Sequence, residues 1–318
     1  MTPARTKLNI EGIEVEVSNL SKVFYPRNGF TKGQVIDYYV QVSPYLLPHL
    51  KKRPITLKRY PNGVGGFFFY EKNCPPHPAW VHTSPVPRSE GGEISYCVID
   101  SLAALVWAAN LADLELHTFL HRVPAIHKPT ALAFDLDPGA PADLISCCKV
   151  GLQLNELFTK LKLKSFPKTS GSKGLQVYVP LNSPATYDKT KEFAHNVALL
   201  LEQRSPEFIV SKMQKSLRKG KVLVDWSQND DHKTTVNVYS LRATERSYVS
   251  TPVTWDEVRK AVSANRVQSL QFESDEVLRR VKAKGDLFAP VLDLKQKLPS
   301  LAALKAAMEK TGSPRGKQ

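Results

Sequence analysis

Alternating and periodic hydrophobic positions along the chain predict both strands and helices. Strict alternation of polar and apolar residues is typical of a half-buried strand, and a short apolar run that stops at a turn is typical of a buried one. The strands expected on these grounds are a short strand or hairpin at 7–17, a strand at 131–137 before Pro138-Gly139, two strands within 164–181 joined by a turn at 170–174, and strands at 221–226 and 234–243.

Helical periodicity and capping residues predict a second set of segments. Thr31 and Thr254 are suitable N-caps, whereas Pro44 and Pro48 are expected to limit the first helix because proline lacks a backbone N–H group. The expected helices are 31–39, 100–112 with the cap-like Asp100-Ser101, 142–163, 186–203, 254–262 and 301–310. The mixed order of strands and helices indicates an α+β or α/β protein with at least one substantial sheet.

The chain has 318 residues, of which 42% are hydrophobic, and this is enough apolar material for one large or two ordinary domains. Its longest apolar run, 102–112, is broken at Asn110 and falls short of the roughly 20 residues that span a membrane. The N-terminal residues alternate in polarity and lack the apolar segment of a signal peptide. We therefore expect a globular protein of the cytosol.

Cysteine usage favours a reducing compartment. Adjacent cysteines such as Cys147 and Cys148 are poorly placed to bridge, and four cysteines in so long a chain do not make a disulfide framework. Cys74 with His77 and His82 is a weak zinc candidate, because a fourth ligand would have to come from elsewhere. The sequence therefore does not favour a zinc site. It also does not favour a disulfide framework made from these cysteines and Cys97.

The formal net charge of +14 makes nucleic acid the first partner to consider, with a charge excess that only aids solubility as the alternative. Two basic segments favour nucleic acid, because KKRPITLKRYPNG at 51–63 and KSLRKGK at 215–221 interleave Lys and Arg with loop residues. The aromatic run 67–70 follows the first segment, and it is either core or a platform on which bases stack.

Asp135 and Asp137 are the sharpest local sign of chemistry. A strand would present both carboxylates on one face and direct Phe134 and Leu136 into the core. Two carboxylates held this close repel each other unless a cation lies between them, and the hard ions Mg²⁺ and Mn²⁺ prefer oxygen ligands. The alternative is an aspartate that merely caps the strand before the Pro-Gly turn.

Two further features have both a chemical and a plain structural interpretation. Asp225 ends the apolar strand KVLVDW, where a charge either has a partner or marks the end of the strand. The small-residue turn at 169–174 can present backbone N–H groups to an anion, with Lys173 supplying charge. Taken alone, such a turn is most often only a turn.

Four segments together, TSGSKGL, FDLDPG, KSLRKGKVLVDWSQN and YSLRA, resemble the motifs of the polymerase domain of bacterial ligase D. This family belongs to the archaeo-eukaryotic primase superfamily and acts in non-homologous end joining. The resemblance runs from about Ser18 to Trp255, with the motifs in the family's order. It implies an α+β primase-polymerase fold with a central mixed or antiparallel sheet flanked by helices, as a single domain over 1–300 followed by a C-terminal helix and disordered basic tail at 301–318.

The resemblance also implies roles for individual residues. The catalytic carboxylates, which bind two Mn²⁺ or Mg²⁺ ions, fall on Asp135, Asp137 and Asp225. The residues implied at the nucleotide are His117, Ser170, Lys173, Gln176, Arg218 and Arg242. Arg218 corresponds to a family arginine that is associated with ordering the active site. Those expected to bind DNA are Lys22 and Lys32 at a 5′-phosphate, Phe69 and Tyr70 at the template kink, and Lys58 and Arg59 in the first basic segment.

One position departs from the family pattern, because Gln176 stands where the family motif SGxKGLH has histidine. Glutamine donates only a neutral hydrogen bond, and charge-assisted bonds are about twice as strong. The departure predicts altered nucleotide affinity or metal dependence rather than lost activity, since all three aspartates remain.

The implied function is template-directed nucleotide transfer that fills gaps and extends ends in double-strand break repair, using NTP or dNTP with a preference for ribonucleotides. The alternatives are a primase or primase-polymerase that starts chains, and a non-catalytic module that synapses DNA ends. The expected partners are DNA ends and gaps with a 5′-phosphate, with a Ku homologue and a separate DNA ligase as candidate protein partners, and no membrane. Because the chain has no room for ligase or phosphoesterase domains, a stand-alone polymerase, cytoplasmic and associated with the nucleoid, is expected.

Overall fold

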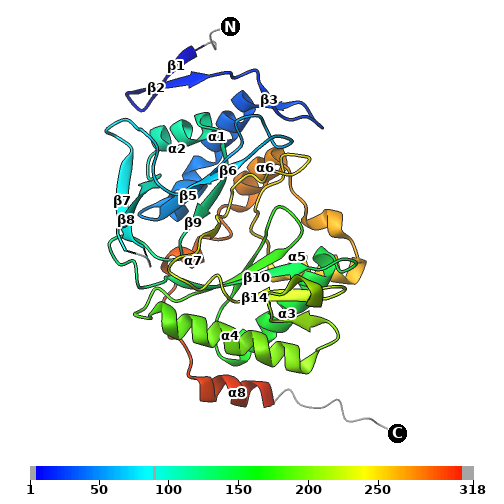
Figure 1. Cartoon of the computed structure of the whole chain (residues 1–318). Helices are drawn as coiled ribbons and strands as arrows, with labels where there is room; N and C mark the ends of the chain where they lie inside the picture. The colour runs from blue at the N-terminus through cyan, green and yellow to red at the C-terminus, as the bar shows by residue number, and fades with distance from the viewer. Residues whose placement is uncertain (1–4, 89–90, 310–318) are drawn as a thin grey trace.

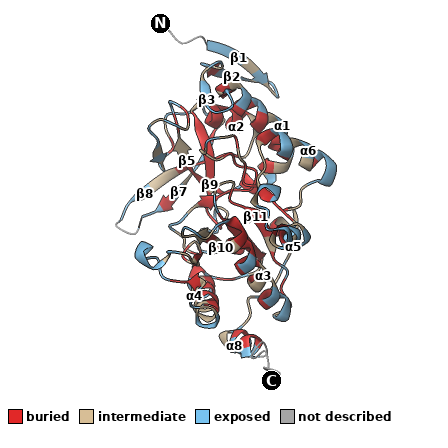
Figure 2. Cartoon of the chain, turned by 90° about the vertical axis from the view of Figure 1, so that its right-hand side faces the viewer, coloured by how far each residue is buried: buried red, intermediate tan, exposed pale blue. Residues whose placement is uncertain are grey.

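Two β-sheets, each covered by helices, form two lobes that lie one above the other in Figure 1. The computed structural model describes residues 5–88 and 91–309. Each lobe has its own cluster of buried hydrophobic side chains. Figure 2 shows that buried residues line strand β10 (Ala131–Pro138), whereas β1 (Arg5–Ile10) is largely exposed.

The first lobe is built around a six-stranded sheet and contains most of the N-terminal part of the chain. Its strands, in spatial order, are β15 (Thr235–Val236), β9 (Asp113–Thr118), β5 (Pro54–Arg59), β8 (Glu93–Val98) and β7 (His82–Pro87), and β6 (Phe69–Glu71) also pairs with β5. The helices of this lobe are α1 (Lys32–Leu50), α2 (Leu102–Asn110), α6 (Ser274–Lys284) and α7 (Pro290–Asp293). Two hairpins complete it, β1 with β2 (Ile13–Ser18) and β3 (Val23–Tyr25) with β4 (Phe30–Thr31).

The second lobe is built around a five-stranded sheet in which β13 and β14 run parallel and the other neighbours run antiparallel. Its order is β11 (Phe166–Thr169), β12 (Leu175–Pro180), β10, β14 (Val222–Asp225) and β13 (Ile209–Val210). The helices are α3 (Leu144–Lys160), α4 (Tyr187–Arg204), α5 (Trp255–Ala264) and α8 (Leu301–Glu309), with 3₁₀ turns η1 (Lys215–Leu217) and η2 (Val267–Leu270). The expected α+β fold with a mixed sheet is thus confirmed.

Several predicted elements are confirmed because local sequence determines them. The hairpin, β10, the pair β11 and β12, and helices α2 to α5 and α8 lie where the pattern predicts them, within a few residues. The Thr31 hydroxyl accepts from the Gln34 N–H at 3.3 Å, and the Gln34 side chain accepts from the Thr31 N–H at 2.8 Å. This reciprocal pair is a capping box, which satisfies backbone donors that the first helical turn leaves free.

The prediction that Pro44 and Pro48 limit the first helix is wrong, because α1 continues through both to Leu50. Proline at 44 cannot donate to the carbonyl of Val40, four residues earlier. The Ser43 hydroxyl donates to that carbonyl instead, at 2.8 Å. The prolines therefore remain within a helix whose other face is buried in the first lobe.

The predicted strand at 234–243 is also wrong beyond its start. Only Thr235–Val236 is a strand, and it pairs with β9 of the first sheet. Tyr239 then has a φ of 63°, in the left-handed region that a strand does not use. The segment thus leaves the ladder after Val236, and Val238, Tyr239 and Leu241 pack into the core of the first lobe instead.

Cys74 and Cys97 form a disulfide across 23 residues of sequence, a single bridge that the sequence analysis did not predict. The backbone N–H of Cys74 donates to the Ser95 carbonyl at 2.7 Å, which aligns the segment after β6 with β8. The sequence could not indicate this alignment, because it depends on sheet packing. Cys147 and Cys148 do not bridge, as expected, and both are buried.

No helix within the described ranges is long and apolar enough to cross a membrane. The predicted disordered tail lies outside the described residues, apart from the helix α8 that precedes it.

Candidate active site

A cavity of about 330 Å³, here called the cleft, is lined by residues of both sheets. His117 of β9 and Thr235 of β15 come from the first sheet, and Asp135, Asp137 and Gln176 come from the second. Of the predicted residues, the cleft brings together Tyr70, His117, Asp135, Asp137, Ser170, Lys173, Gln176 and Arg242. It is also lined by residues that the sequence analysis missed, among them Ser172, Gln228, Thr234 and Thr235.

A row of polar side chains crosses the second sheet at Asp135. Asp135 lies directly opposite Gln176 of β12 and Asp225 of β14, and Lys168 of β11 lies opposite Gln176. Directly opposite residues project from the same face of a sheet. The other face carries Phe134 and buries it against the helices.

The two aspartates of β10 are held in an unfavourable electrostatic environment. Burial, followed by the charge of Asp137, raises the pKa of Asp135 to about 7, although the Gln176 amide and Lys168 act in the opposite direction. Burial and the charge of Asp225 likewise raise the pKa of Asp137. Oδ1 of Asp135 is buried and has no hydrogen-bond partner among the described residues. Such a pair needs a cation to remain fully ionised.

The oxygen ligands that the protein offers fit a hard divalent cation that takes its other ligands from a substrate and from water. Among residues 5–88 and 91–309, no three acidic, His or Cys side chains are grouped to hold a metal ion alone. Asp225 accepts from the N–H and hydroxyl of Ser227 at 2.8 and 2.6 Å and from Gln228 at 2.9 Å, and it does not line the cleft. Mg²⁺ is usually held by one or two carboxylates together with substrate phosphates and water. Asp135 and Asp137, with the orphaned oxygen of Asp135, meet that description.

Lys168 is a fully buried cation beneath the cleft that the sequence analysis missed. Its ammonium group donates to the Val236 carbonyl at 3.0 Å and to the Ser250 hydroxyl at 2.6 Å. Burial lowers its pKa to about 7, while the Asp135 charge opposes that shift. A lysine following proline in strand β11 gave no sign of this role, because its neighbours come from other parts of the chain.

The turn at 170–174 is closed by its own serine. The Ser170 hydroxyl accepts from the N–H groups of Ser172 and Gly174 at 3.2 and 3.0 Å, so two of the amides expected to face an anion are already used. Lys173 is exposed at the rim of the cleft, and Arg242 donates to the Ser170 carbonyl. A Cβ at Gly174 would lie 2.3 Å from the Leu136 carbonyl oxygen, so only glycine allows the turn to approach β10.

Gln176 projects to the same side as Asp135, as its alternation predicts. Its side chain is 2% exposed and its amide donates to the Thr235 hydroxyl at 3.2 Å, while its carbonyl oxygen has no partner in the described chain. Arg218 does not line the cleft, and its guanidinium donates to the Met213 carbonyl. Its charge nevertheless acts against the raised pKa of Asp137.

Glu115 of β9 has several polar and charged partners beside the cleft, and the sequence analysis missed it. Its side chain is 3% exposed and accepts from Lys58 at 3.1 Å, Tyr60 at 3.2 Å and His117 at 2.9 Å. Arg242 forms an ion pair with it at 3.2 Å. A carboxylate within the apolar strand LEL is itself a sign that could have identified it, because a buried charge requires partners.

The aromatic run 67–70 is an exposed platform and not core. Phe67, Phe68 and Tyr70 are 73%, 45% and 57% exposed, whereas Phe69 is half-buried against Phe67 and Arg59. Lys58, predicted to bind DNA, lies beneath the rings of Phe68 and Tyr70.

Lys58 and Arg59 both form ion pairs within the protein. Lys58 pairs with Glu115, and Arg59 pairs with Glu71 at 2.7 Å.

Lys22 and Lys32, the two lysines expected at a 5′-phosphate, lie close together despite their different environments. Lys22 donates to the Pro61 carbonyl and to Asn62, at 2.7 and 2.8 Å. Burial lowers the pKa of Lys32 to about 8, with further contributions from Lys22 and Arg59. We call Lys22, Lys32 and Arg59 together the Lys32 cluster.

Comparison with known proteins agrees with this geometry. Residues 31–288 match the family model described as LigD, primase-polymerase domain. The chain is 39% identical over 280 residues to the multifunctional non-homologous end joining protein LigD of Mycolicibacterium smegmatis, covering 87% of this chain and 36% of that protein. It is 30% identical over 274 residues to the bifunctional non-homologous end joining protein LigD of Bacillus subtilis, covering 86% and 43%.

A solved structure, the polymerase domain from Mycobacterium tuberculosis ligase D in complex with DNA, is also similar. Its TM-score is 0.81 at 39% identity, covering 89% of this chain and 99% of that one. The chain thus spans about two-fifths of the length of the LigD proteins above, and the similar part corresponds to one polymerase domain.

Proposed function

Since the chain belongs to the LigD primase-polymerase domain family, we propose that it is a nucleotidyltransferase that extends a DNA-bound primer during double-strand break repair. The observation that carries the proposal is the cleft, in which the buried, unpartnered oxygen of Asp135 lies beside Asp137 and opposite the cationic side chains Lys173 and Arg242. A divalent cation supplies the charge that the two aspartates lack, and the polyphosphate that accompanies it is matched to Lys173 and Arg242.

In the proposed mechanism, the acidic residues of the cleft bind metal ions and the basic residues bind the triphosphate. Asp135 and Asp137 would hold one or two Mg²⁺ or Mn²⁺ ions, with Asp225 supporting them from the neighbouring strand. When bound, such ions lower the pKa of an attacking hydroxyl and stabilise a transferring phosphoryl group. Lys173 and Arg242 bind the triphosphate, while Gln176 positions Thr235 through its amide hydrogen bond.

The exposed platform of Phe67, Phe68 and Tyr70 is proposed to stack bases of the template next to the cleft. Tyr70 supports this, because it lines the cleft and its ring contacts His117 at a centroid distance of 6.2 Å. The Lys32 cluster is proposed to bind the 5′-phosphate of a gap, since Lys22 and Arg59 stand close enough to Lys32 to lower its pKa.

Other parts of the proposal rest on the family alone. They are the preference for ribonucleotides, the use of Mn²⁺, and cooperation with a Ku homologue and a separate ligase. The relatives named above are non-homologous end joining proteins, and we propose the same pathway for this chain.

Primer extension on a gapped duplex tests the proposal, with each nucleotide type and either ion. Asp137→Ala should lower the extension rate by about 10²–10³-fold or more while DNA affinity stays within about twofold, because the carboxylate serves chemistry and the basic surface serves binding. Asp188→Ala is the control, since this exposed acid lies on α4 away from the cleft.

Three other outcomes would contradict the proposal. Wild-type rates in Asp137→Ala would remove the metal assignment. Synthesis without a primer would favour the primase alternative, and DNA binding without any extension would favour a module that only synapses ends.

A further inference from the structure

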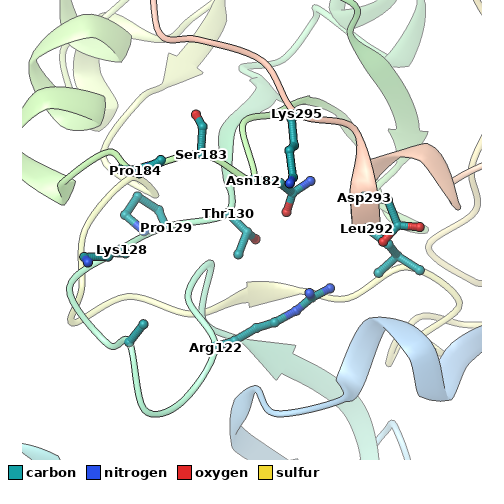
Figure 3. A pocket seen from close by; sticks show the side chains of 11 residues that line it. Arg122, Lys128, Pro129, Thr130, Asn182, Ser183, Pro184, Leu292, Asp293 and Lys295 are labelled. Carbon is teal, nitrogen blue, oxygen red and sulfur yellow. The ribbon is translucent and has the colours of Figure 1, made fainter.

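A second cavity, of about 490 Å³, lies away from the cleft and is lined by residues of the segments 122–130, 182–184 and 292–295 (Figure 3). We call it the Arg122 pocket. It shares no lining residue with the cleft. β10 begins beside Thr130 and reaches Asp135 five residues later, about 17 Å along the strand. The two cavities are therefore separate sites.

The walls of the Arg122 pocket are joined by hydrogen bonds. The Thr130 carbonyl accepts from the N–H groups of Leu181 and Asn182, at 2.8 and 2.9 Å. The Asn182 side chain donates to the carbonyls of Val291 and Leu294, at 3.1 and 3.0 Å. The pocket is thus formed before any ligand enters, which lowers the entropic cost of binding.

Its lining is strongly cationic. Arg122, Lys128 and Lys295 line it, and Asp293 is the acidic lining residue. None of the three cations forms a hydrogen bond or ion pair with another residue in the described part of the chain, and the Nε atom of Arg122 is buried without a partner. Figure 3 shows Arg122 and Lys295 reaching into the pocket from opposite walls.

A fourth positive charge lies directly behind the pocket. Arg53 is 8% exposed and donates to the Thr130 hydroxyl at 2.7 Å and to the Leu120 carbonyl at 2.7 Å. Because these partners are neutral oxygens, the charge of Arg53 is not cancelled where it is buried. Burial and the nearby Arg122 lower its pKa to about 10, so it is still charged at neutral pH.

The remaining lining is apolar, from Pro129, Pro184 and Leu292. A ligand that suits the whole pocket therefore combines an anionic group with a flat or apolar part. A planar guanidinium and an ammonium group together are well matched to a phosphate, and the volume lies within the range of small-ligand pockets. Asp293 would suit a hydroxyl of the same ligand.

We infer that the Arg122 pocket binds a nucleotide unit, with Arg122 and Lys295 on its phosphate and the proline-lined wall on its base. The unit is either a free nucleotide or one nucleotide of a nucleic-acid strand, since both present the same phosphate. This site is distinct from the cleft and does not depend on the function proposed above.

Photo-crosslinking of the whole chain with 8-azido-ATP in EDTA tests the inference, with labelled peptides identified by mass spectrometry. Labelling is expected within 122–130 or 182–184. Arg122→Ala with Lys295→Ala should weaken it at least tenfold, and Lys149→Ala, which removes an exposed cation from α3, should change it less than twofold. Lys295→Glu alone, at an exposed position, should also weaken it and cannot do so through misfolding of the core.

Competition with unlabelled ligands distinguishes a free nucleotide from a nucleotide of a nucleic-acid strand. AMP should displace the probe, whereas adenosine should not. Displacement by oligothymidylate as well would assign the pocket to a strand, and its failure would assign it to a free nucleotide. The inference is overturned if adenosine competes as well as AMP, if labelling is confined to cleft residues such as Tyr70 and His117, or if the double variant binds like Lys149→Ala.

Discussion

At the scale of the residue, Glu115 positions the side chains around the cleft. Burial alone would raise the pKa of Glu115, but the hydrogen bond from His117 and the charges of Arg242 and Lys58 hold it well below its usual range. One carboxylate thereby fixes a cleft histidine, a cleft arginine and the lysine beneath the aromatic platform. Truncating such a residue leaves several buried donors without an acceptor.

We expect Glu115→Gln to reduce the free energy of unfolding by about 3 kcal/mol and to raise the apparent KM for the nucleotide more than it lowers kcat. Glutamine keeps the shape of the side chain but cannot balance Arg242 and Lys58. Glu71→Gln is the control, because its pair with Arg59 is one-quarter exposed and is worth less than about 1 kcal/mol. Urea unfolding and nucleotide titrations measure both effects, and an unchanged KM would contradict the positioning role.

At the scale of the element, helices α5 and α6 are joined through one carboxylate. Glu257 completes the capping box of α5 with Thr254, and it accepts from Arg280 and Lys284 of α6. Burial would raise its pKa, but the hydrogen bonds from Arg280 and Lys284 lower it from 4.5 to about 2. A carboxyl group whose pKa is lower in the folded state stabilises the fold above its unfolded pKa.

We expect Glu257→Gln to lower the free energy of unfolding by about 1–2 kcal/mol at pH 7, after allowance for solvent screening. The difference from the wild type should shrink as the pH falls from about 4.5 toward 2, because the wild-type carboxylate then becomes protonated. Glu156→Gln, in the exposed pair with Lys160 on α3, should change stability by less than about 0.5 kcal/mol. A difference that stays constant across this pH range, measured by denaturant unfolding, would rule out the ionic contribution.

At the scale of the whole molecule, the net charge of +14 and the cleft serve separate purposes. The Lys32 cluster brings together residues from the loop before β3, from α1 and from β5. The aspartates lie in the other lobe, on β10. DNA affinity and nucleotide chemistry should therefore respond to different substitutions.

Lys22→Ala with Lys32→Ala should abolish the preference for a gap that carries a 5′-phosphate over one that carries a hydroxyl. It should also reduce the slope of log affinity against log salt by about 1.5, because each phosphate contact releases about 0.7–0.9 counterion. Lys149→Ala should leave both unchanged. Titrations of labelled gapped duplexes at several salt concentrations provide the measurement, and an intact phosphate preference would place the 5′-phosphate site elsewhere.

The sequence by itself determined the features that depend on neighbouring residues. Thr31, Thr186 and Thr254 cap their helices because a hydroxyl bonds to a backbone N–H within the next turn. The two-residue spacing of Asp135 and Asp137 places both carboxylates on one face of a strand, as the cleft confirms. The motif order was also sufficient to identify the family.

The tertiary structure alone decided which distant segments meet. It placed Lys168, Gln176, Asp135 and Asp225 in one row, because strand register is set by packing across the sheet and not by the strand itself. It joined Cys74 to Cys97, and it gave Glu115 its partners. It also kept Pro44 within α1, because a buried face outweighs the loss of one backbone hydrogen bond whose acceptor a serine satisfies.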